Sequence, residues 1–468
     1  MNSSKVIRSH RRAATWMAAL ALASALRGQT SAPPSGLTLS QAVETALRNY
    51  PAIRVTQEQM NAAAAGIRLA QTAYLPRVDG LAQINRATRN AFYGLLLPQG
   101  VIPNVAGVPS NNLGSVWDSG LGVLVTWQPY DFGLRAANIA AATAARNQAQ
   151  ATANRTRFDI SVATADAFLT VVAAQQTAQA ARAAVDSWQI LLKSIHALVA
   201  AQLRPGADES RVQAELAAAE TQVAQAEQAI DIARSTVAQF VGLDPSQISL
   251  NPGKSTGQPP AERPEPALDA AANPLALEQN AAIAHEQSQL KALERTYYPQ
   301  FFVQGLAAAR GTGLVTGGSR LGGLNGLAPT VQNYGLGLTV TFPAMDRFAI
   351  REREAMQSAN IRAGQAQYEL VTTNLKARFN AAMAALSGAR RVAANTPVEV
   401  SAAQTALQQA TARYQAGLAP IDDVAQAQRL LVQAQIDDAL ARLNVWRGLL
   451  EVATARGDIG PFLAEAGE

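Results

Sequence analysis

Two adjacent carboxylates, Asp422 and Asp423, are the side chains whose type and spacing point most directly to a function. They follow Pro420 at the start of a predicted helix, where the helix dipole stabilises negative charge. If several copies of the chain surrounded this point, the carboxylates of all copies would form an acidic constriction that favours cations. Both interpretations stay open, because a carboxylate in a first helical turn can serve both roles.

The other residues with reactive or metal-binding side chains do not form a predicted catalytic, metal or cofactor site. His10, His196 and His285 fall on separate segments, so each is best explained as a surface histidine. Residues 252–256 (PGKST) resemble the end of a phosphate-binding loop, but Ile248 occupies the position of the required first glycine. The chain has no cysteine, which excludes disulfides and metal thiolates. We therefore expect a protein that is not an enzyme and that holds no cofactor and no metal.

The composition favours long, closely packed helices over several separate globular cores. The 468 residues include only 5% aromatic and 16% charged residues, and alanine, which dominates the apolar fraction, has the highest helix propensity. The net charge of +5 comes from five basic residues in the first 32, because the rest of the chain holds 34 basic and 34 acidic residues. This balance predicts no nucleic-acid partner.

Residues 1–32 are predicted to be a signal peptide for export. A basic stretch up to Arg12 precedes an apolar run from Ala13 to Leu26, which is shorter than the ~20 residues of a membrane-spanning helix. An uncleaved N-terminal anchor is the less favoured alternative. No later segment offers an uninterrupted apolar run of spanning length, so strands must carry any role in a membrane.

Four segments alternate between apolar residues and small or polar ones, as strands with one apolar face do. The clearest is residues 334–342, and the others are residues 76–85, 120–128 and 300–310. Each has about nine to eleven residues, the length that crosses a bilayer at the tilt of a barrel strand.

The same order of elements occurs twice, which predicts a tandem structural repeat. The first repeat (37–243) has a long helix at 131–203 and a return helix at 208–241. A linker at 244–266 separates it from the second repeat (267–460), which has a long helix at 346–415 and a return helix at 420–456. The proline spacing agrees, since 25 residues separate Pro51 from Pro76 and also Pro274 from Pro299.

Local signals predict two details of these helices. Leu37–Asn49 has the pattern of a short amphipathic helix with Ser40 as its N-cap. Residues 396–399 (TPVE) have the pattern of a capping box with proline at the first helical position. Because Pro397 would cost about 3 kcal/mol inside a helix, we expect the second long helix to be broken or kinked near 394–397.

Four strands cannot close a barrel, so a membrane location requires other copies of the chain. Two copies would give eight strands, three twelve and four sixteen, and the pattern does not choose among them. A soluble β-sandwich is less favoured, since only helices are available to cover the apolar face. Aromatic residues flank the strands as the interfacial girdles of membrane barrels do: Tyr74, Trp117, Trp127, Tyr297, Tyr334 and Phe342.

Several motifs together resemble the TolC-type outer membrane efflux protein family, also called outer membrane factors. They are LTLSQAVETALRNYP (37–51), YLPRV (74–78), TWQPYDFG (126–133), TFPAMD (341–346) and RYQAG (413–417). The order and duplication of the motifs make the resemblance specific over residues 37–460. The chain departs from the family pattern at three places. Arg347 and Phe348 stand where glycines usually follow the aspartate. Arg211 stands in place of an aspartate, and Gln426 in place of a further acid.

The resemblance implies an α+β membrane protein in which a long α-helical hairpin barrel is fused to a transmembrane β-barrel. It implies four strands per chain, twelve in a homotrimer, and a location in the outer membrane that extends into the periplasm. The implied partners are outer-membrane lipid, a periplasmic adaptor (membrane fusion) protein and an inner-membrane transporter. No partner is expected among nucleic acids.

The expected function is that of an exit duct that passively exports small molecules. An exit duct for type I protein secretion and a periplasmic coiled-coil scaffold without a pore are the alternatives. On this interpretation Asp422 and Asp423 lie at the periplasmic gate. The expected adaptor contacts at the helical tips are Gly206, Arg413, Tyr414 and Gly417.

Overall fold

The computed structural model describes residues 36–88, 114–264, 266–315 and 319–467, so the predicted signal peptide lies outside the described residues. The chain divides by its contacts into two compact units. We call Pro51–Phe158 together with Leu268–Arg378 the sheet unit. We call the described residues of Met1–Tyr50, Asp159–Ala267 and Phe379–Glu468 the helical unit.

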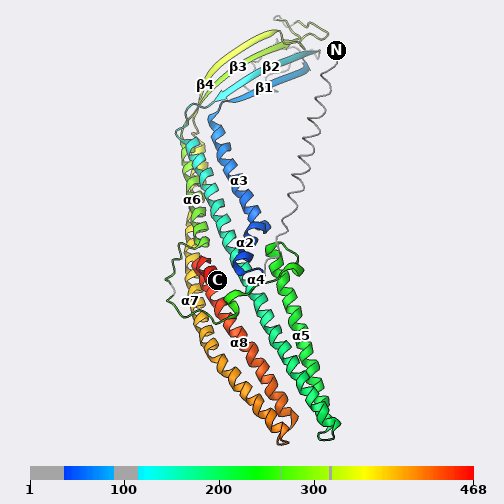
Figure 1. Ribbon diagram of the computed structural model, residues 1–468. Coiled ribbons are helices and arrows are strands. Elements are labelled where there is room, and N and C mark those ends of the chain that lie inside the picture. The colour runs from blue at the N-terminus through cyan, green and yellow to red at the C-terminus, as the bar shows by residue number, and fades with distance from the viewer. Residues whose placement is uncertain (1–35, 89–113, 265, 316–318, 468) are drawn as a thin grey trace, which may run out of the picture. The chain divides into compact units, whose positions relative to one another are not determined.

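The sheet unit carries one antiparallel sheet, whose strands lie in the order of the chain (Figure 1). The strands are β1 (Arg77–Thr88), β2 (Ser115–Trp127), β3 (Gln300–Thr312) and β4 (Val331–Thr341). The predicted set of four strands is confirmed, and each sequence repeat supplies one hairpin. β1 and β4 are edge strands, so each presents a row of backbone groups that pairs with no strand in the described chain.

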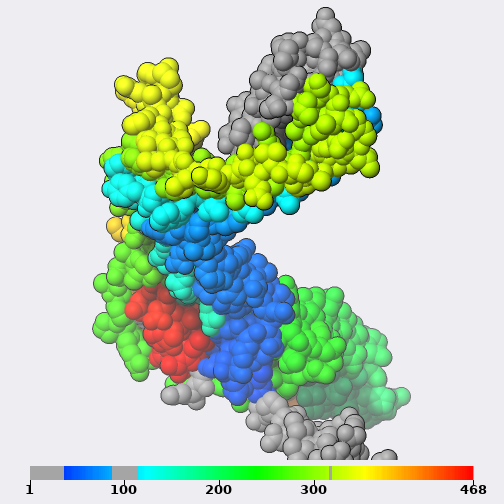
Figure 2. All heavy atoms as spheres, turned by 90° about the horizontal axis from the view of Figure 1, so that it is seen from above, coloured from blue at the N-terminus to red at the C-terminus, as the bar shows by residue number. Residues whose placement is uncertain are grey.

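The register gives the sheet one apolar face and one face of small and polar residues. The apolar face consists of residues that pair across the sheet: Val78, Gly80 and Ala82 of β1, Leu121, Val123 and Val125 of β2, Val303, Gly305 and Ala307 of β3, and Leu338, Leu336 and Tyr334 of β4. Leu336 is 84% exposed and Val78 62%, so no element of the described ranges covers this face at these two positions on the edge strands. In Figure 2 atoms of β3 and β4, in yellow-green, lie at the surface of the molecule.

Helices extend from one end of the sheet within the same unit. They are α3 (Pro51–Gln71), α6 (Pro274–Glu294) and the first parts of two long helices, α4 (Leu134–Ala200) and α7 (Asp346–Gln415). α6 contacts both long helices: His285 Nδ1 lies 2.8 Å from Gln148 Oε1 of α4, and Gln357 Nε2 of α7 donates to the Glu286 carbonyl at 3.0 Å. The helix order α4, α6, α7 therefore follows the order of their strands.

The helical unit combines the remaining parts of α4 and α7 with α2 (Leu39–Asn49), α5 (Gly206–Val241), α8 (Ile421–Arg456) and α9 (Gly460–Gly467). Its main core surrounds Trp446 and Phe168, which are fully buried together with Leu386 and Leu443. A Cβ atom on Gly448 would lie 3.1 Å from Leu386 Cα, so the glycine permits a close approach of α8 to α7. One helix of the described chain, α4, is long and apolar enough to cross a membrane by composition, but 44% of its most apolar stretch is buried.

The predicted linker (244–266) is packed within the helical unit. It contains two short 3-10 helices, η3 (Pro245–Gln247) and η4 (Gly253–Thr256). The Leu37 amide donates to the Ser249 carbonyl, and the Asn251 amide donates to the Leu37 carbonyl. Ile248, the residue that breaks the phosphate-loop pattern, is buried in a core with Val237 and Val241 of α5.

The N-cap of α2 is Thr38, so the prediction of Ser40 was wrong. Thr38 is extended, and its hydroxyl accepts a hydrogen bond from the Gln41 amide at 3.3 Å. Gln41 Oε1 accepts one from the Thr38 amide in return, at 3.1 Å. This reciprocal capping box satisfies two backbone donors at once, whereas Ser40 already lies inside the helix.

The predicted break near 394–397 was also wrong, because α7 continues through Pro397 from Asp346 to Gln415; the alternative of a kink there stays a prediction. The predicted capping residue, Thr396, is buried and donates its hydroxyl hydrogen to Asp438 Oδ1 of α8 at 2.8 Å. Leu386 and Ala403, on either side of the proline, are buried as well. Packing against the unit therefore outweighs the local cost of about 3 kcal/mol.

Candidate functional site

The helical unit has two helical hairpins, α4–α5 and α7–α8, each of which ends in a turn. The predicted tip glycines, Gly206 and Gly417, differ in their place in these turns. Gly417 has φ +78°, a left-handed conformation that favours glycine and ends α7. Gly206 instead begins α5, and the left-handed residue of the first turn is Gln202, with φ +59°. A side chain at position 206 would meet open space among the described residues.

Tyr414 joins the two tips to each other. Its hydroxyl donates to Asp208 Oδ2 of α5 at 2.9 Å, and the Arg204 guanidinium lies 4.4 Å from the centre of its ring. Arg204 also donates to the Tyr414 carbonyl. The ring packs in a core with Trp188 and Ile421, and the residue is only 2% exposed. In this arrangement Tyr414 has no surface for an adaptor, whereas Arg413, Gly206 and Gly417 are exposed.

The environment of Tyr414 favours its protonated form. Burial, the hydrogen bond to Asp208 and the negative charge of Asp208 together raise the pKa of Tyr414 to about 12, against the opposing positive charge of Arg204. Burial opposes the charged form, and a phenol that donates to a carboxylate loses this bond when it ionises. At neutral pH Tyr414 is therefore protonated, and its hydrogen bond to Asp208 is formed.

The two candidate gate acids differ in their surroundings. Asp422 Oδ1 lies 3.3 Å from Arg211 Nε of the other hairpin, so an ion pair partly neutralises its charge. Arg211 and Arg429 both lie near Glu215, at 3.6 and 3.2 Å. Asp423, which lies in the first turn of α8, makes no ion pair with any residue that the structure describes. Arg211, which departs from the family pattern, therefore pairs with Asp422 and not with Asp423. Of the two candidate gate acids, Asp423 is the one without an ion-pair partner in the described chain.

Most of the predicted girdle residues gather at the end of the sheet from which the helices extend. Tyr74 and Tyr297 precede β1 and β3, while Trp127 ends β2 and Phe342 follows β4, and all four are exposed. Trp127 Nε1 donates to the Tyr74 carbonyl at 3.2 Å.

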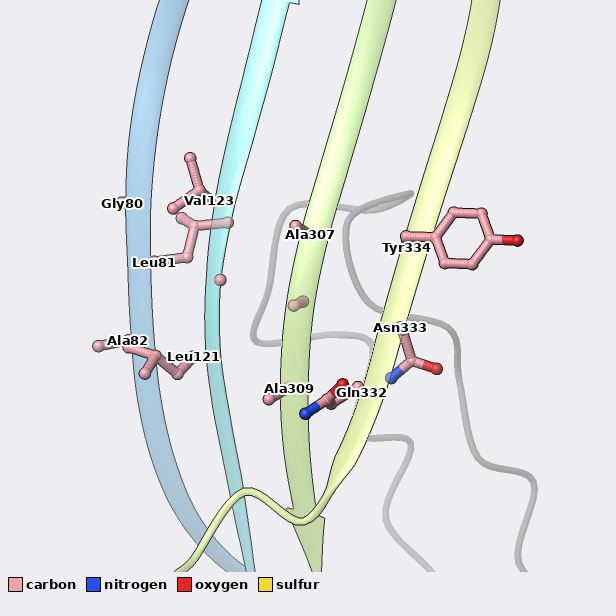
Figure 3. A pocket seen from close by; sticks show the side chains of 12 residues that line it. Gly80, Leu81, Ala82, Leu121, Val123, Ala307, Ala309, Gln332, Asn333 and Tyr334 are labelled. Atoms are coloured by element: carbon pink, nitrogen blue, oxygen red, sulfur yellow. The ribbon is translucent and has the colours of Figure 1, made fainter.

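The two remaining residues predicted for a girdle, Trp117 and Tyr334, do not share a row of the sheet. Trp117 pairs with Arg86, whereas Tyr334 pairs with Ala307 and, through it, lies in the row of Val123 and Gly80. Tyr334 is 94% exposed and points away from the edge strand in the close-up view (Figure 3). Whether these six residues form membrane girdles stays a prediction.

A buried ion pair at the start of α4 was missed by the sequence reasoning. Asp131 Oδ2 lies 2.8 Å from Arg135 Nε, both side chains are almost fully buried, and the guanidinium stacks 4.4 Å from the ring centre of Tyr74. Burial raises the pKa of Asp131, but hydrogen bonds from the backbone and side chain of Arg135 and from the Gly133 amide outweigh it, so the pKa ends below its ordinary value. The pair joins the end of β2 to α4, and its i, i+4 spacing was the available signal.

The hollow on the sheet contains no catalytic group. It measures about 1040 Å³ and is lined by residues of all four strands, among them Gly80, Ala82, Ala307 and Ala309 (Figure 3). Its polar side chains are Gln332, Asn333 and Tyr334, which offer no nucleophile–base pair. Within the described ranges, no group of three His, Asp or Glu side chains could hold a metal ion.

Comparison with known proteins agrees with this architecture. Three solved structures are similar. They are CusC, described as forming a transmembrane channel (TM-score 0.74, 12% identity, covering 91% of this chain and 93% of that one), and two outer-membrane channels, CmeC of Campylobacter jejuni (0.70, 14%, 90% and 85%) and MtrE of Neisseria gonorrhoeae in its open state (0.67, 15%, 90% and 89%). No curated protein matches. The sequence profile of the family described as "Outer membrane efflux protein" matches residues 42–243 and 269–458, the two predicted repeats. Because these segments cover most of the chain, this outer-membrane protein belongs to the outer membrane efflux protein family.

Proposed function

We propose that three copies of this chain form the outer-membrane exit duct of a tripartite efflux system. The observation that carries the proposal is the open four-stranded sheet, with an exposed apolar face and two unpaired edges. In lipid each unpaired backbone group would cost several kcal/mol, so the edges must be closed by other copies. Three copies give the twelve strands that the family resemblance implies.

In this proposal the duct is passive and carries small molecules delivered by an inner-membrane transporter. A periplasmic adaptor protein contacts the helical tips, at which Gly206, Arg413 and Gly417 are exposed. The Tyr414–Asp208 hydrogen bond holds the two tips of one chain together. Separation of the tips opens the duct, which agrees with the open state in which MtrE was solved. Asp423 supplies the acidic constriction.

Planar-bilayer recording of the detergent-purified protein tests the duct. We expect heat-resistant oligomers from the outer-membrane fraction that conduct ions, and a deletion strain that becomes more susceptible to small toxic compounds. Oligomers that never conduct would support a scaffold instead. A deletion strain that accumulates a secreted protein but keeps its resistance to small compounds would support type I secretion. A monomer that is soluble without detergent would contradict the whole proposal.

A further inference from the structure

The end of the sheet that lies opposite the helices carries positive charge and no acid. α3 leads into β1 and β2 leads into α4, so the helices extend from one end, and we call the opposite end the outer end (Figure 1). Because the helices of this outer-membrane protein extend into the periplasm, the outer end lies toward the outer leaflet. Beyond the row in which Asn85 pairs with Asp118, the only charged side chains among the described residues are Arg86 and Arg320.

Arg86 stands on the apolar face of the sheet. It pairs with Trp117, and the alternation of a strand places both on the same face as Ile84 and Leu121. Ile84 is 65% exposed and Leu121 57%, and Arg86 is exposed as well. In a transmembrane β-barrel the apolar face is turned toward lipid, so Arg86 is a cation at the lipid surface.

The spacing of two tryptophans gives the depth of Arg86 in the membrane. Trp127 lies ten residues beyond Trp117 on the same face of β2, at the inner end of the strand. At about 3.3 Å per residue and a tilt of about 40°, this distance spans roughly 25 Å, the height of the apolar band of a membrane barrel. The residues of this face between the two tryptophans are uncharged: Ser119, Leu121, Val123 and Val125. The row of Arg86 and Trp117 therefore lies at the outer boundary of the hydrocarbon.

Two neighbours fix the guanidinium of Arg86. Its Nε donates to Ser115 Oγ at 3.0 Å, and its central carbon lies 5.3 Å from the centre of the Trp117 ring. Within the described ranges its two terminal nitrogens have no partner, and no carboxylate neutralises the charge. A planar guanidinium held in this way presents a fork of N–H donors that matches two oxygens of a phosphate group.

We propose that Arg86 binds a phosphate group of the phosphorylated glycolipid in the outer leaflet. The outer leaflet of an outer membrane consists largely of such lipids, and their phosphates lie where the sugar head group meets the acyl chains. The indole of Trp117 suits the same depth, because its ring is apolar and its N–H is polar.

Arg320 adds a second positive charge at the outer end. The Leu321 amide donates to the Gly313 carbonyl at 2.9 Å, and the Gly313 amide donates to the Trp117 carbonyl at 2.9 Å. Two hydrogen bonds thus connect the segment of Arg320 to the strand that carries Trp117. With no acid beside it, this end attracts an anionic surface.

A lipid fits this surface better than a free phosphate ion does. One guanidinium and one indole do not enclose a small anion. An amphipathic ligand can instead use both parts of the surface, with its acyl chains against the exposed Ile84 and Leu121 and its phosphate against Arg86.

Native mass spectrometry of the full-length protein, purified in a mild detergent and stripped of lipid, tests the site. The probes are lipid A, dephosphorylated lipid A and inorganic phosphate. We expect the wild type to bind lipid A more tightly than its dephosphorylated form. Arg86→Gln is expected to bind lipid A roughly 10- to 100-fold more weakly, because it loses hydrogen bonds to a charged acceptor. Arg86→Lys keeps the charge but not the fork, so its affinity should fall between the two.

Arg77→Gln is the matched control. Arg77 is an exposed arginine of the same strand, but it lies at the inner end, on the polar face, and pairs with Asp79. This variant should bind lipid A as the wild type does. Arg320→Gln should show a smaller loss than Arg86→Gln. Circular dichroism checks that each variant keeps the wild-type fold.

Three results would overturn the site. The first is equal affinity of the wild type for lipid A and dephosphorylated lipid A, and the second is wild-type affinity of Arg86→Gln for lipid A. The third is displacement of lipid A by millimolar inorganic phosphate, which would show a general anion site. The inference does not depend on conduction, because Arg86 lies on the apolar face, so the site can fail while the duct stands and the duct can fail while the site stands.

Discussion

Replacing Tyr414 with phenylalanine tests the gate directly. The substitution keeps the buried ring and the Arg204 contact but removes the hydroxyl that donates to Asp208 at 2.9 Å. A hydrogen bond to a charged acceptor contributes about 1.5–3 kcal/mol. Because about 1.4 kcal/mol is a factor of ten in an equilibrium constant, we expect Tyr414→Phe to raise the open-to-closed ratio of the tips roughly 10- to 100-fold.

Single-channel recording in planar bilayers measures this ratio as the open probability. The pH dependence supplies a second readout, since the pKa of Tyr414 is raised from 10.0 to about 12. A raised pKa means that the protonated phenol stabilises the closed tips, so this contribution is complete below pH 10 and is lost as the pH rises through about 12. The wild-type channel is expected to open over that interval, and Tyr414→Phe to show no such rise.

Tyr50→Phe is the matched control, because Tyr50 packs against Phe240 in the same unit and takes no part in the tips. It should leave open probability and alkaline opening as in the wild type. The gating argument is refuted if Tyr414→Phe has the wild-type open probability at neutral pH and still opens above pH 10.

Three further predictions concern other parts of the chain. Asp423→Asn should lower the cation preference of the channel more than Asp422→Asn, because Arg211 already pairs with Asp422; equal reversal potentials for the two variants would count against this. Arg135→Met leaves the Asp131 carboxylate buried without its partner and should lower the free energy of unfolding by about 3–5 kcal/mol, whereas the double variant with Asp131→Asn should lose less; thermal unfolding followed by circular dichroism compares them. Pro397→Ala restores a backbone donor in the interior of α7 and should raise the melting temperature, since proline costs about 3 kcal/mol there; an unchanged or lower value in calorimetry would contradict this reasoning.

The general plan of this protein could be predicted from its sequence because the signals are local and repeated. Period-two alternation over nine or more residues requires a strand with two different faces, and long alanine-rich segments without proline require helices. Duplication of both, at equal proline spacing, indicates the tandem repeat. The need for other copies follows as well, since four strands cannot close.

Local signals failed where long-range packing competed with them. The TPVE pattern at 396–399 predicts a helix start, but Asp438, 42 residues away, binds the Thr396 hydroxyl and the helix continues. Asp422 and Asp423 are equivalent in the sequence, and only the position of Arg211 on the other hairpin distinguishes them. Tyr414 was expected on the surface, yet the packing of two tips 206 residues apart buries it against Asp208.

The sequence by itself determined which segments are strands and helices, because backbone conformation follows from the pattern of neighbouring side chains. Only the tertiary structure decided which polar groups are neutralised and which are buried. Those properties depend on distances between residues far apart in the chain, and charge and burial act through such distances.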